Sequence, residues 1–284
     1  MQFDEVELRK TVAILKPCNQ LFEVRCIGNK IVYSGYFDDV DVLVKELGKN
    51  TFQGCNNVYI TLNALNNAVA SRSQRGIFEK TPNVSTSDKD VIGMDWLMVD
   101  LDPRRPTGVS SSDEELEESK SLGNDIYKFM KSLGFEKPVV ANSGNGVHLL
   151  YRIALKNTKE NIELLSMALK TLDMLFSNDD IEVDKTNFNP ARICKLYGTM
   201  AKKGSNTKIR PHRMSNIIGN YDEVRISEKV YLEKLCSYFP KEADKPQKYN
   251  NYNPKEFNLE EWLDKYGIRY TKTSYSDGTK YILD

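Results

Sequence analysis

The sequence predicts an α+β fold, because segments with the two-residue period of strands and segments with helical spacing follow one another along the chain. Residues 21–28 (LFEVRCIG) and 30–37 (KIVYSGYF) alternate as two adjacent strands with a Gly-Asn turn signal between them. Residues 158–176 instead place apolar side chains every three or four positions, as an amphipathic helix does. Residues 96–102 (WLMVDLD) open with a continuous apolar run, which is typical of a buried strand.

The remaining elements follow from the same patterns. A short helix is expected at 38–47, ended by Gly48, and a longer helix is expected to run to about Leu133 after a capping box made by Ser111 and Glu114. Loops are expected at 83–90 and 103–112, further strands at 57–63, 138–144, 147–155, 181–184 and 193–203, and further helices at 64–73 and 227–239.

The composition divides the chain into four parts. We expect a main domain over residues 1–222, followed by a C-terminal helix within 223–239. Residues 240–257 are rich in Pro, Asn and Lys and are expected to be a linker. Residues 258–284 predict a small tail of one helix and one hairpin, which is too short to hold a good core of its own.

Charge and cysteine content limit the classes of protein that the chain can belong to. The formal net charge is zero, so a generally basic, nucleic-acid-binding coat is excluded and any anion site must be local. We expect no membrane span, because no apolar run approaches 18 residues. We expect no signal peptide, because residues 1–10 (MQFDEVELRK) contain acids and no apolar stretch. The five cysteines are scattered and form no CxxC pattern, so we expect a reducing, cytoplasmic location.

Two acids, Asp100 and Asp102, end the apolar run at 96–102. Residues two apart on a strand point to the same side, so their carboxylates repel each other. A divalent cation resolves this repulsion, and Mg²⁺ binds one or two carboxylates together with phosphates and water. The alternative is a pair of surface acids at the end of a strand.

A glycine-rich turn follows at SGNG. Gly144 and Gly146 allow a backbone to approach an anion closely, and successive N–H groups can surround a phosphate. Ser143 and Asn145 add side-chain donors, and His148 begins the next strand. The alternative is a plain hairpin with a histidine in the core.

A third segment contains Asp184 at the end of a strand, followed by Arg192 and Lys195. Lys195 lies within an apolar strand, where an ammonium group needs an anionic partner. A nucleoside triphosphate would supply that partner. The alternative is an internal salt bridge, for example between Lys195 and Asp184.

The same region is strongly basic. No acid occurs from Lys185 to Tyr221, whereas eight basic residues do: Lys185, Arg192, Lys195, Lys202, Lys203, Lys208, Arg210 and Arg213. Such a tract concentrates positive charge of the kind that contacts nucleic-acid phosphates. A solvated loop is the alternative for Lys202 and Lys203, but it explains the RPHR block less well.

Taken together, the motifs VDLD (99–102), SGNGVH (143–148) and EVD (182–184) resemble those of the archaeo-eukaryotic primase (AEP) superfamily, especially its phage and plasmid primase-polymerases. The resemblance covers roughly residues 55–215 and includes the flanks YITLN, TSDKDVIGMDWLMVDLDPRRP, NPARICKLYGTMAKKG and RPHR. It implies a core in which an α/β module joins an RRM-like sheet, with the active site in the cleft between them. Residues 1–222 would be the catalytic domain.

The resemblance also implies roles for individual residues. Asp100, Asp102 and Asp184 would be catalytic and would hold two Mg²⁺ or Mn²⁺ ions, one on the nucleotide phosphates and one on the attacking 3′-hydroxyl. Nucleotide binding is implied for Ser143, Gly144, Asn145, Gly146, His148, Arg192, Lys195 and His212. Contact with nucleic acid is implied for Lys202, Lys203, Arg210 and Arg213.

The implied activity is template-directed synthesis from NTPs or dNTPs on single-stranded DNA. The tail is similar to a segment that follows the primase domain in many phage primases, so a replicative helicase is an expected partner, in the same chain or in another. Two alternatives stay open: a repair or end-joining polymerase that extends but does not initiate, and a non-catalytic nucleic-acid-binding replication factor.

Overall fold

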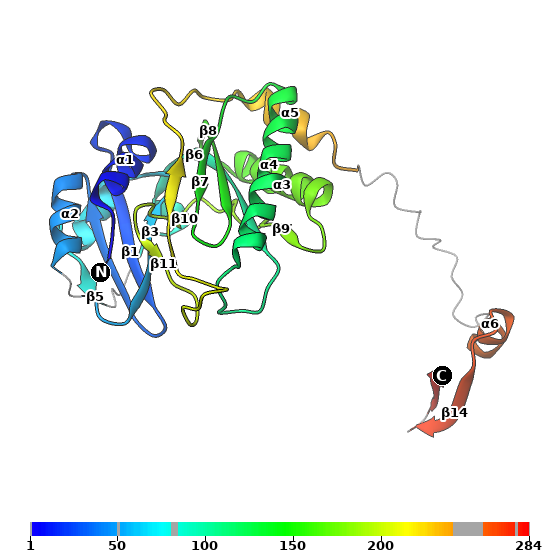
Figure 1. Ribbon diagram of the computed structural model, residues 1–284. Helices are drawn as coiled ribbons and strands as arrows, with labels where there is room; N and C mark the ends of the chain where they lie inside the picture. Colours follow the sequence, from blue (N-terminus) through cyan, green and yellow to red (C-terminus); the bar gives the residue numbers. More distant parts are fainter. Residues whose placement is uncertain (1, 50–51, 81–84, 241–257, 276–277, 284) are drawn as a thin grey trace. The chain divides into compact units, whose positions relative to one another are not determined.

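The computed structural model describes residues 2–49, 52–80, 85–240, 258–275 and 278–283. The chain divides into two compact units, residues 1–239 and 240–284, and each is described by itself. The larger unit confirms the expected α+β class, because antiparallel sheets and helices alternate along it (Figure 1). None of the helices in the described ranges is both long enough and apolar enough to cross a membrane.

The first sheet holds five antiparallel strands in the order β10-β3-β1-β2-β5. Their bounds are Ile193–Lys195 (β10), Cys55–Thr61 (β3), Phe22–Gly28 (β1), Val32–Phe37 (β2) and Glu79–Lys80 (β5). Helices α1 (Glu5–Leu15) and α2 (Val40–Gly48) pack on this side of the unit, at the left of Figure 1, and bury their leucines in one core with β1.

The second sheet has the order β13-β7-β8-β6-β4, with β9 also paired to β6. The bounds are Asn216–Ile218 (β13), Val139–Asn142 (β7), Val147–Lys156 (β8), Val91–Pro103 (β6), Ala64–Leu65 (β4) and Ile181–Val183 (β9). Three helices cover the face of this sheet that points away from the first sheet, at the right of Figure 1. They are α3 (Asp113–Leu133), α4 (Lys159–Phe176) and α5 (Lys229–Cys236). A short ribbon pairs β11 (Met200–Ala201) with β12 (Arg213–Met214).

Strand β6 is buried on both faces, which explains its continuous apolar run. Trp96 and Met98 are each 2% exposed and lie in the core shared with the first sheet. The odd-numbered positions 97–101 pack instead against α3 and α4 in the second core. Because side chains alternate along a strand, Asp100 and Asp102 continue the Trp96–Met98 row toward the first sheet.

Several elements differ from the sequence prediction. Helix α1 was not expected; Asp4 caps it, and its buried residues are few among many charged ones, which weakens the helical pattern. The capping box of α3 uses Ser112 and Glu115, one residue later than expected. Residues 64–73 form β4 and a 3₁₀ helix at Asn67–Arg72 rather than an α-helix. The strand expected at 193–203 is interrupted, because the chain turns between β10 and β11.

The smaller unit contains α6 (Leu259–Lys265) and a hairpin of β14 (Tyr270–Tyr275) with β15 (Gly278–Leu283). Leu263 is 3% exposed, whereas Trp262 and Tyr266 are 43% and 60% exposed, so little apolar surface is buried in this part. Residues 241–257 of the expected linker, and Asp277 of the expected hairpin turn, lie outside the described residues.

The tight contact between α1 and the segment before β11 generates a prediction about stability. Gly198 has a φ of +85°, and a Cβ there would stand 2.6 Å from the Leu8 nitrogen and 2.8 Å from the Asp4 oxygen. The Gly198→Ala variant should therefore lose about 3 kcal/mol or more of unfolding free energy, from left-handed strain plus overpacking. Urea denaturation measures this loss.

Gly219 provides the matched control for Gly198. Its φ is +88°, yet a Cβ there would meet no atom within 4 Å. Gly219→Ala should thus lose only the strain, about 1–2 kcal/mol. Equal losses in the two variants would show that α1 does not press on Gly198 in solution.

Candidate active site

A cleft of about 420 Å³ lies between the two sheets and gathers residues from segments far apart in the sequence. Its lining residues are Ile27, Asn57, Tyr59, Met98, Asp100, Asp102, Ser143, Asn145, His148, Arg192, Ile193, Cys194, Lys195, Ala201 and Lys203. The expected location of the site between two sheets is therefore what the structure has. Eight of the residues singled out from the sequence line the cleft; Gly144, Gly146, Asp184, Lys202, Arg210, His212 and Arg213 do not.

Strand register explains why three of the polar residues meet. Asp100 on β6 pairs directly with His148 on β8. On the other side of β6, the Asp184 backbone N–H donates to the Asp100 carbonyl oxygen at 2.9 Å, directly after β9 ends. His148, Asp100 and Asp184 thus stand in one row across three neighbouring strands.

His148 holds the carboxylate of Asp100. The imidazole is 5% exposed, and its Nε2 lies 3.3 Å from Asp100 Oδ1. Burial acts to lower the pKa of His148, but the charge and hydrogen bond of Asp100 outweigh it and raise the pKa to about 10. His148 is therefore an imidazolium at neutral pH, and Asp100 stays ionised beside it.

A buried tyrosine fixes the orientation of that imidazole. Tyr197 Oη lies 2.7 Å from His148 Nδ1, and the ring of Tyr197 is fully buried. Cys194 Sγ lies 3.3 Å from the same hydroxyl. The sequence analysis missed Tyr197 and Cys194, because a Tyr and a Cys in an apolar strand look like ordinary core residues.

Asp102 is the second carboxylate of the cleft. Burial and the charge of Asp100 raise its pKa, while Lys203 and Arg105 act to lower it. Arg105 Nη2 lies 3.0 Å from Asp102 Oδ1, and Lys203 Nζ lies 3.7 Å from Oδ2. Repulsion between Asp100 and Asp102 therefore persists despite two cationic neighbours.

The pair fits a divalent cation, because two carboxylates that share one face and repel each other are the hard oxygen ligands that Mg²⁺ and Mn²⁺ take. The carboxylate of Asp184 already has two partners: Oδ1 accepts from the Thr186 backbone N–H at 2.8 Å, and Oδ2 lies 3.3 Å from Arg192 Nη2. Over the described ranges, no three or more His, Cys, Asp or Glu side chains form a group that could hold a metal ion. A site with all three acids thus stays a prediction.

The SGNG turn is packed tightly against β6. Ser143 Oγ accepts from the Gly146 N–H at 3.1 Å, and Asn145 Oδ1 accepts from the Ser111 N–H at 2.9 Å. Gly146 cannot carry a side chain, since a Cβ would stand 2.2 Å from the Leu101 carbonyl oxygen. The turn is therefore held at a fixed position beside Asp102, with Ser143 and Asn145 at the cleft.

Lys195 is the buried cation of the cleft. Lys195 lines the cleft and is 4% exposed. Its Nζ donates to the Met200 carbonyl at 2.9 Å and to Asn57 Oδ1 at 3.3 Å. Burial lowers its pKa to about 7. No carboxylate of a described residue lies within 4.0 Å of Nζ, so the internal ion pair left open by the sequence does not form; Arg192 pairs with Asp184 instead.

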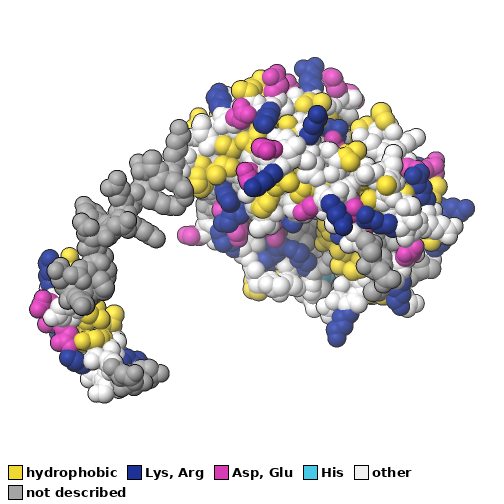
Figure 2. Space-filling view, turned by 180° about the vertical axis from the view of Figure 1, so that it is seen from behind, with side chains coloured by type: hydrophobic (Ala, Val, Ile, Leu, Met, Phe, Trp, Pro, Cys, Tyr) yellow, Lys and Arg dark blue, Asp and Glu magenta, His cyan; other side chains and the backbone are white. Residues whose placement is uncertain are grey.

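Much of the basic tract is neutralised by acids from elsewhere in the fold. The pairs are Lys185–Asp173, Arg192–Asp184, Lys203–Asp102, Arg210–Glu115 and Arg213–Asp113. His212 Nε2 lies 3.0 Å from the Gly204 carbonyl. The acidic first turn of α3 thus anchors Arg210 and Arg213. On the face in Figure 2, charges of both signs are interspersed.

Solved structures similar to the chain include a phage primase-polymerase domain and a primase. No family model and no curated protein matches the chain. The AEP domain of the primase-polymerase of cyanophage S-2L is 13% identical, with a TM-score of 0.46, over 84% of this chain and 100% of that domain. The primase RepB′ is 12% identical, with a TM-score of 0.45, over 82% of this chain and 62% of that one.

The desolvated ammonium of Lys195 predicts a pH dependence of stability. Its pKa is about 7 in the folded chain, against an ordinary value of 10.5. Between pH 7 and pH 10.5, the unfolded chain therefore binds more protons than the folded chain at this group. The unfolding free energy should rise with pH over that range. Lys195→Met should flatten that rise by up to about 1.4 kcal/mol per pH unit. Urea denaturation from about pH 6 to 10 measures the slope.

Lys202→Met is the control, because Lys202 is only partly buried and should leave the slope unchanged. Identical slopes for wild type and Lys195→Met would contradict the burial of a titrating ammonium in the cleft.

Proposed function

We propose that the protein is a metal-dependent nucleotidyltransferase that makes or extends primers on single-stranded DNA. The observation that carries the proposal is one cleft that joins the carboxylate pair Asp100 and Asp102 to the buried ammonium of Lys195. Carboxylates suit a divalent cation, and a desolvated cation suits phosphate. The order and identity of the AEP-like motifs in the sequence support the same activity.

In this proposal, the triphosphate of an NTP or dNTP binds between the SGNG turn and β10. Lys195 and Arg192 line the cleft and provide positive charge, and Lys195 gains the anionic partner that the described fold does not supply. Ser143 and the backbone of 144–146 would contact phosphate oxygens. Charge-assisted hydrogen bonds of this kind are about twice as strong as neutral ones, which suits a leaving pyrophosphate.

Asp100 and Asp102 would hold Mg²⁺ or Mn²⁺, which when bound neutralises phosphate charge and lowers the pKa of an attacking hydroxyl. His148 positions Asp100 through Nε2, and Tyr197 positions His148 through Nδ1. Asp184 stands one strand away and is engaged by Arg192 and Thr186. It would join the metal set only after release from these partners.

Template contact would fall mainly to the lysines. Arg210 and Arg213 each form an ion pair of 2.6 Å with the start of α3, so we assign them to holding the 200–214 segment in place. Lys203 lies at the rim of the cleft with 42% of its side chain exposed, and Lys202 is adjacent to it. A helicase partner and a cytoplasmic location, which suits five free thiols, belong to the same proposal.

Primer synthesis on single-stranded DNA tests the activity directly. Purified protein is supplied with labelled ATP or GTP, dNTPs and Mn²⁺, without a primer. Wild type should give short products, and the Asp100→Ala, Asp102→Ala double variant should lose at least about 1,000-fold in rate, because the metal site is removed. Glu117→Ala is the matched control, since Glu117 is a 69% exposed acid that does not line the cleft.

The outcomes separate the candidate functions. Products only when a primer is added would favour a polymerase that extends but does not initiate. No incorporation with either Mg²⁺ or Mn²⁺, with or without primer, would overturn the proposed activity. Nucleic-acid binding without incorporation would leave the non-catalytic replication factor.

Nucleotide binding isolates the role of the cleft from chemistry. Lys195→Met should weaken binding of a nucleoside triphosphate at least about tenfold, because one charge-assisted contact of roughly 1.4 kcal/mol or more is lost. Asp100→Ala should abolish the additional binding that Mn²⁺ provides. Binding of single-stranded DNA should stay unchanged in both variants, and loss of DNA binding as well would point to unfolding rather than to a nucleotide site.

A further inference from the structure

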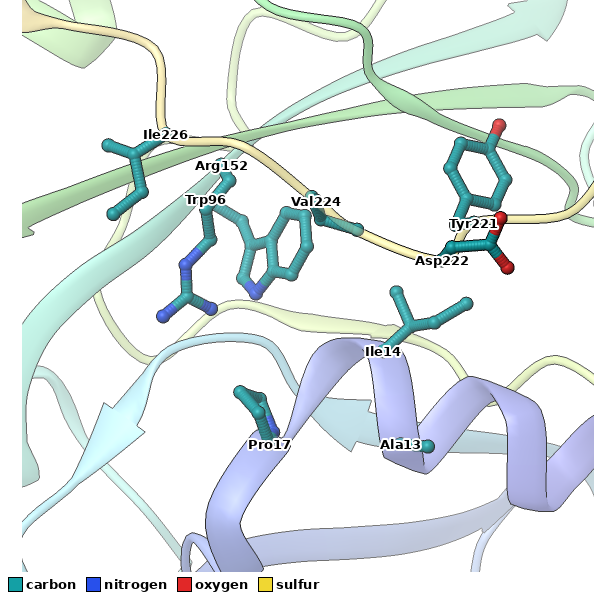
Figure 3. Close-up of a pocket in the computed structure, with 9 residues that line it drawn as sticks. All are labelled: Ala13, Ile14, Pro17, Trp96, Arg152, Tyr221, Asp222, Val224 and Ile226. Carbon is teal, nitrogen blue, oxygen red and sulfur yellow. The ribbon is translucent and has the colours of Figure 1, made fainter.

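A second cavity, of about 350 Å³, is lined by Trp96 of β6, which lies on the same face of the strand as Asp100 and Asp102. Figure 3 shows the residues that line this cavity. Trp96 and Arg152 form its inner wall. Trp96 and Asp100 are four residues apart, which is about 13 Å along a strand. None of the residues that line this cavity lines the active-site cleft, so the two are separate sites.

The inner wall carries one donor without a partner, the Trp96 indole N–H, beside the Arg152 guanidinium, whose Nη2 lies 3.2 Å from Asp95 Oδ1. Trp96 is 2% exposed, and its indole Nε1 has no hydrogen-bond partner. Trp96 pairs with Arg152 across the two strands, which places the guanidinium 5.1 Å from the indole ring centre. Figure 3 shows the indole nitrogen and the guanidinium directed to the same side, toward Pro17. An unpartnered buried donor costs about 1–3 kcal/mol, and an acceptor placed here would offset this cost.

The rest of the cavity is largely apolar. Ile14 and Pro17 at the end of α1 form one wall, and Val224 and Ile226 of the segment after β13 form another. The exception is Asp222, a carboxylate on the same segment as Val224 that is exposed to solvent. The cavity therefore combines donors inside, apolar walls and one negative charge at the entrance.

We propose that this cavity is a second ligand site, which takes a carboxylate attached to an apolar body. The carboxylate would accept from the Trp96 indole N–H and the Arg152 guanidinium, and the apolar body would lie against Ile14 and Val224. A purely apolar ligand would leave the Trp96 N–H without an acceptor. A polyphosphate would bring several negative charges to one guanidinium, past Asp222.

Tryptophan fluorescence tests the site without reference to any activity. The chain has two tryptophans, so the Trp262→Phe variant leaves Trp96 as the single fluorophore. The probe is 3-phenylpropionate, and its matched control is 3-phenylpropanol, which has the same body without the charge. The acid should change Trp96 emission saturably and bind at least tenfold more tightly than the alcohol.

A variant of α1 links the binding to this cavity. Arg152→Gln is unsuitable alone, because it leaves Asp95, 3.2 Å from Arg152 Nη2 and 7% exposed, without its cation. Ala13 lines the cavity from an exposed helix position, so Ala13→Leu should fill space and weaken binding at least fivefold. Val6→Leu is the control, since Val6 is 78% exposed and does not line the cavity.

The same titrations decide the source of the ligand. Gly-Gly-Phe presents a carboxylate beside an apolar side chain at a chain end. If this tripeptide binds more tightly than 3-phenylpropionate, the ligand is the C-terminus of a partner chain. If 3-phenylpropionate binds more tightly than the tripeptide, the ligand is a small metabolite. Equal affinity for 3-phenylpropionate and 3-phenylpropanol would overturn the proposal, as would no saturable change of Trp96 emission with the acid. Unchanged binding of the acid by Ala13→Leu would also overturn it, and so would displacement of the acid by ATP.

Discussion

The pairing of β6 with β8 is the interaction on which the rest of the structure depends. Strand β6 is covered by a core on each face, so a slip of its register by one residue would turn Asp100 and Asp102 into the apolar core formed with α3 and α4. That register sets Asp100 opposite His148 and Trp96 opposite Arg152. The candidate active-site cleft and the second cavity thus both depend on this strand pairing.

Compensation of buried charge organises the cleft. Each acid has a cationic neighbour. The pairs are Asp100 with His148, Asp102 with Arg105 and Lys203, and Asp184 with Arg192. Lys195 differs, because backbone and amide oxygens surround it and burial lowers its pKa to about 7. Among the described residues, the acids of the cleft have cationic partners, whereas no carboxylate lies within 4.0 Å of Lys195 Nζ, and this difference is what the proposed metal-bound triphosphate would use.

The sequence anticipated the elements with strong patterns and missed those without them. The buried run at 96–102 and the amphipathic helix α4 were expected, since their burial leaves a clear apolar period. Helix α1 was missed because four buried residues among many charged ones leave a weak period. The basic tract was expected to present free positive charge, but acids on α3 and β6 neutralise much of it, and composition contains no information about such distant partners.

By itself, the sequence determined the α+β class, the β6 acids, the SGNG turn and the need of Lys195 for a partner, because these follow from local periodicity and from the cost of burying charge. Only the tertiary structure shows that Asp184 pairs with Arg192 and that Tyr197 orients His148. It alone also shows that the indole N–H of Trp96 has no partner among the described residues. The physical reason is that strand pairing brings together distant residues, such as Asp100 with His148 and Trp96 with Arg152, and sets the surroundings in which these side chains find or lack partners. Register is a property of the packed sheet and not of any one strand.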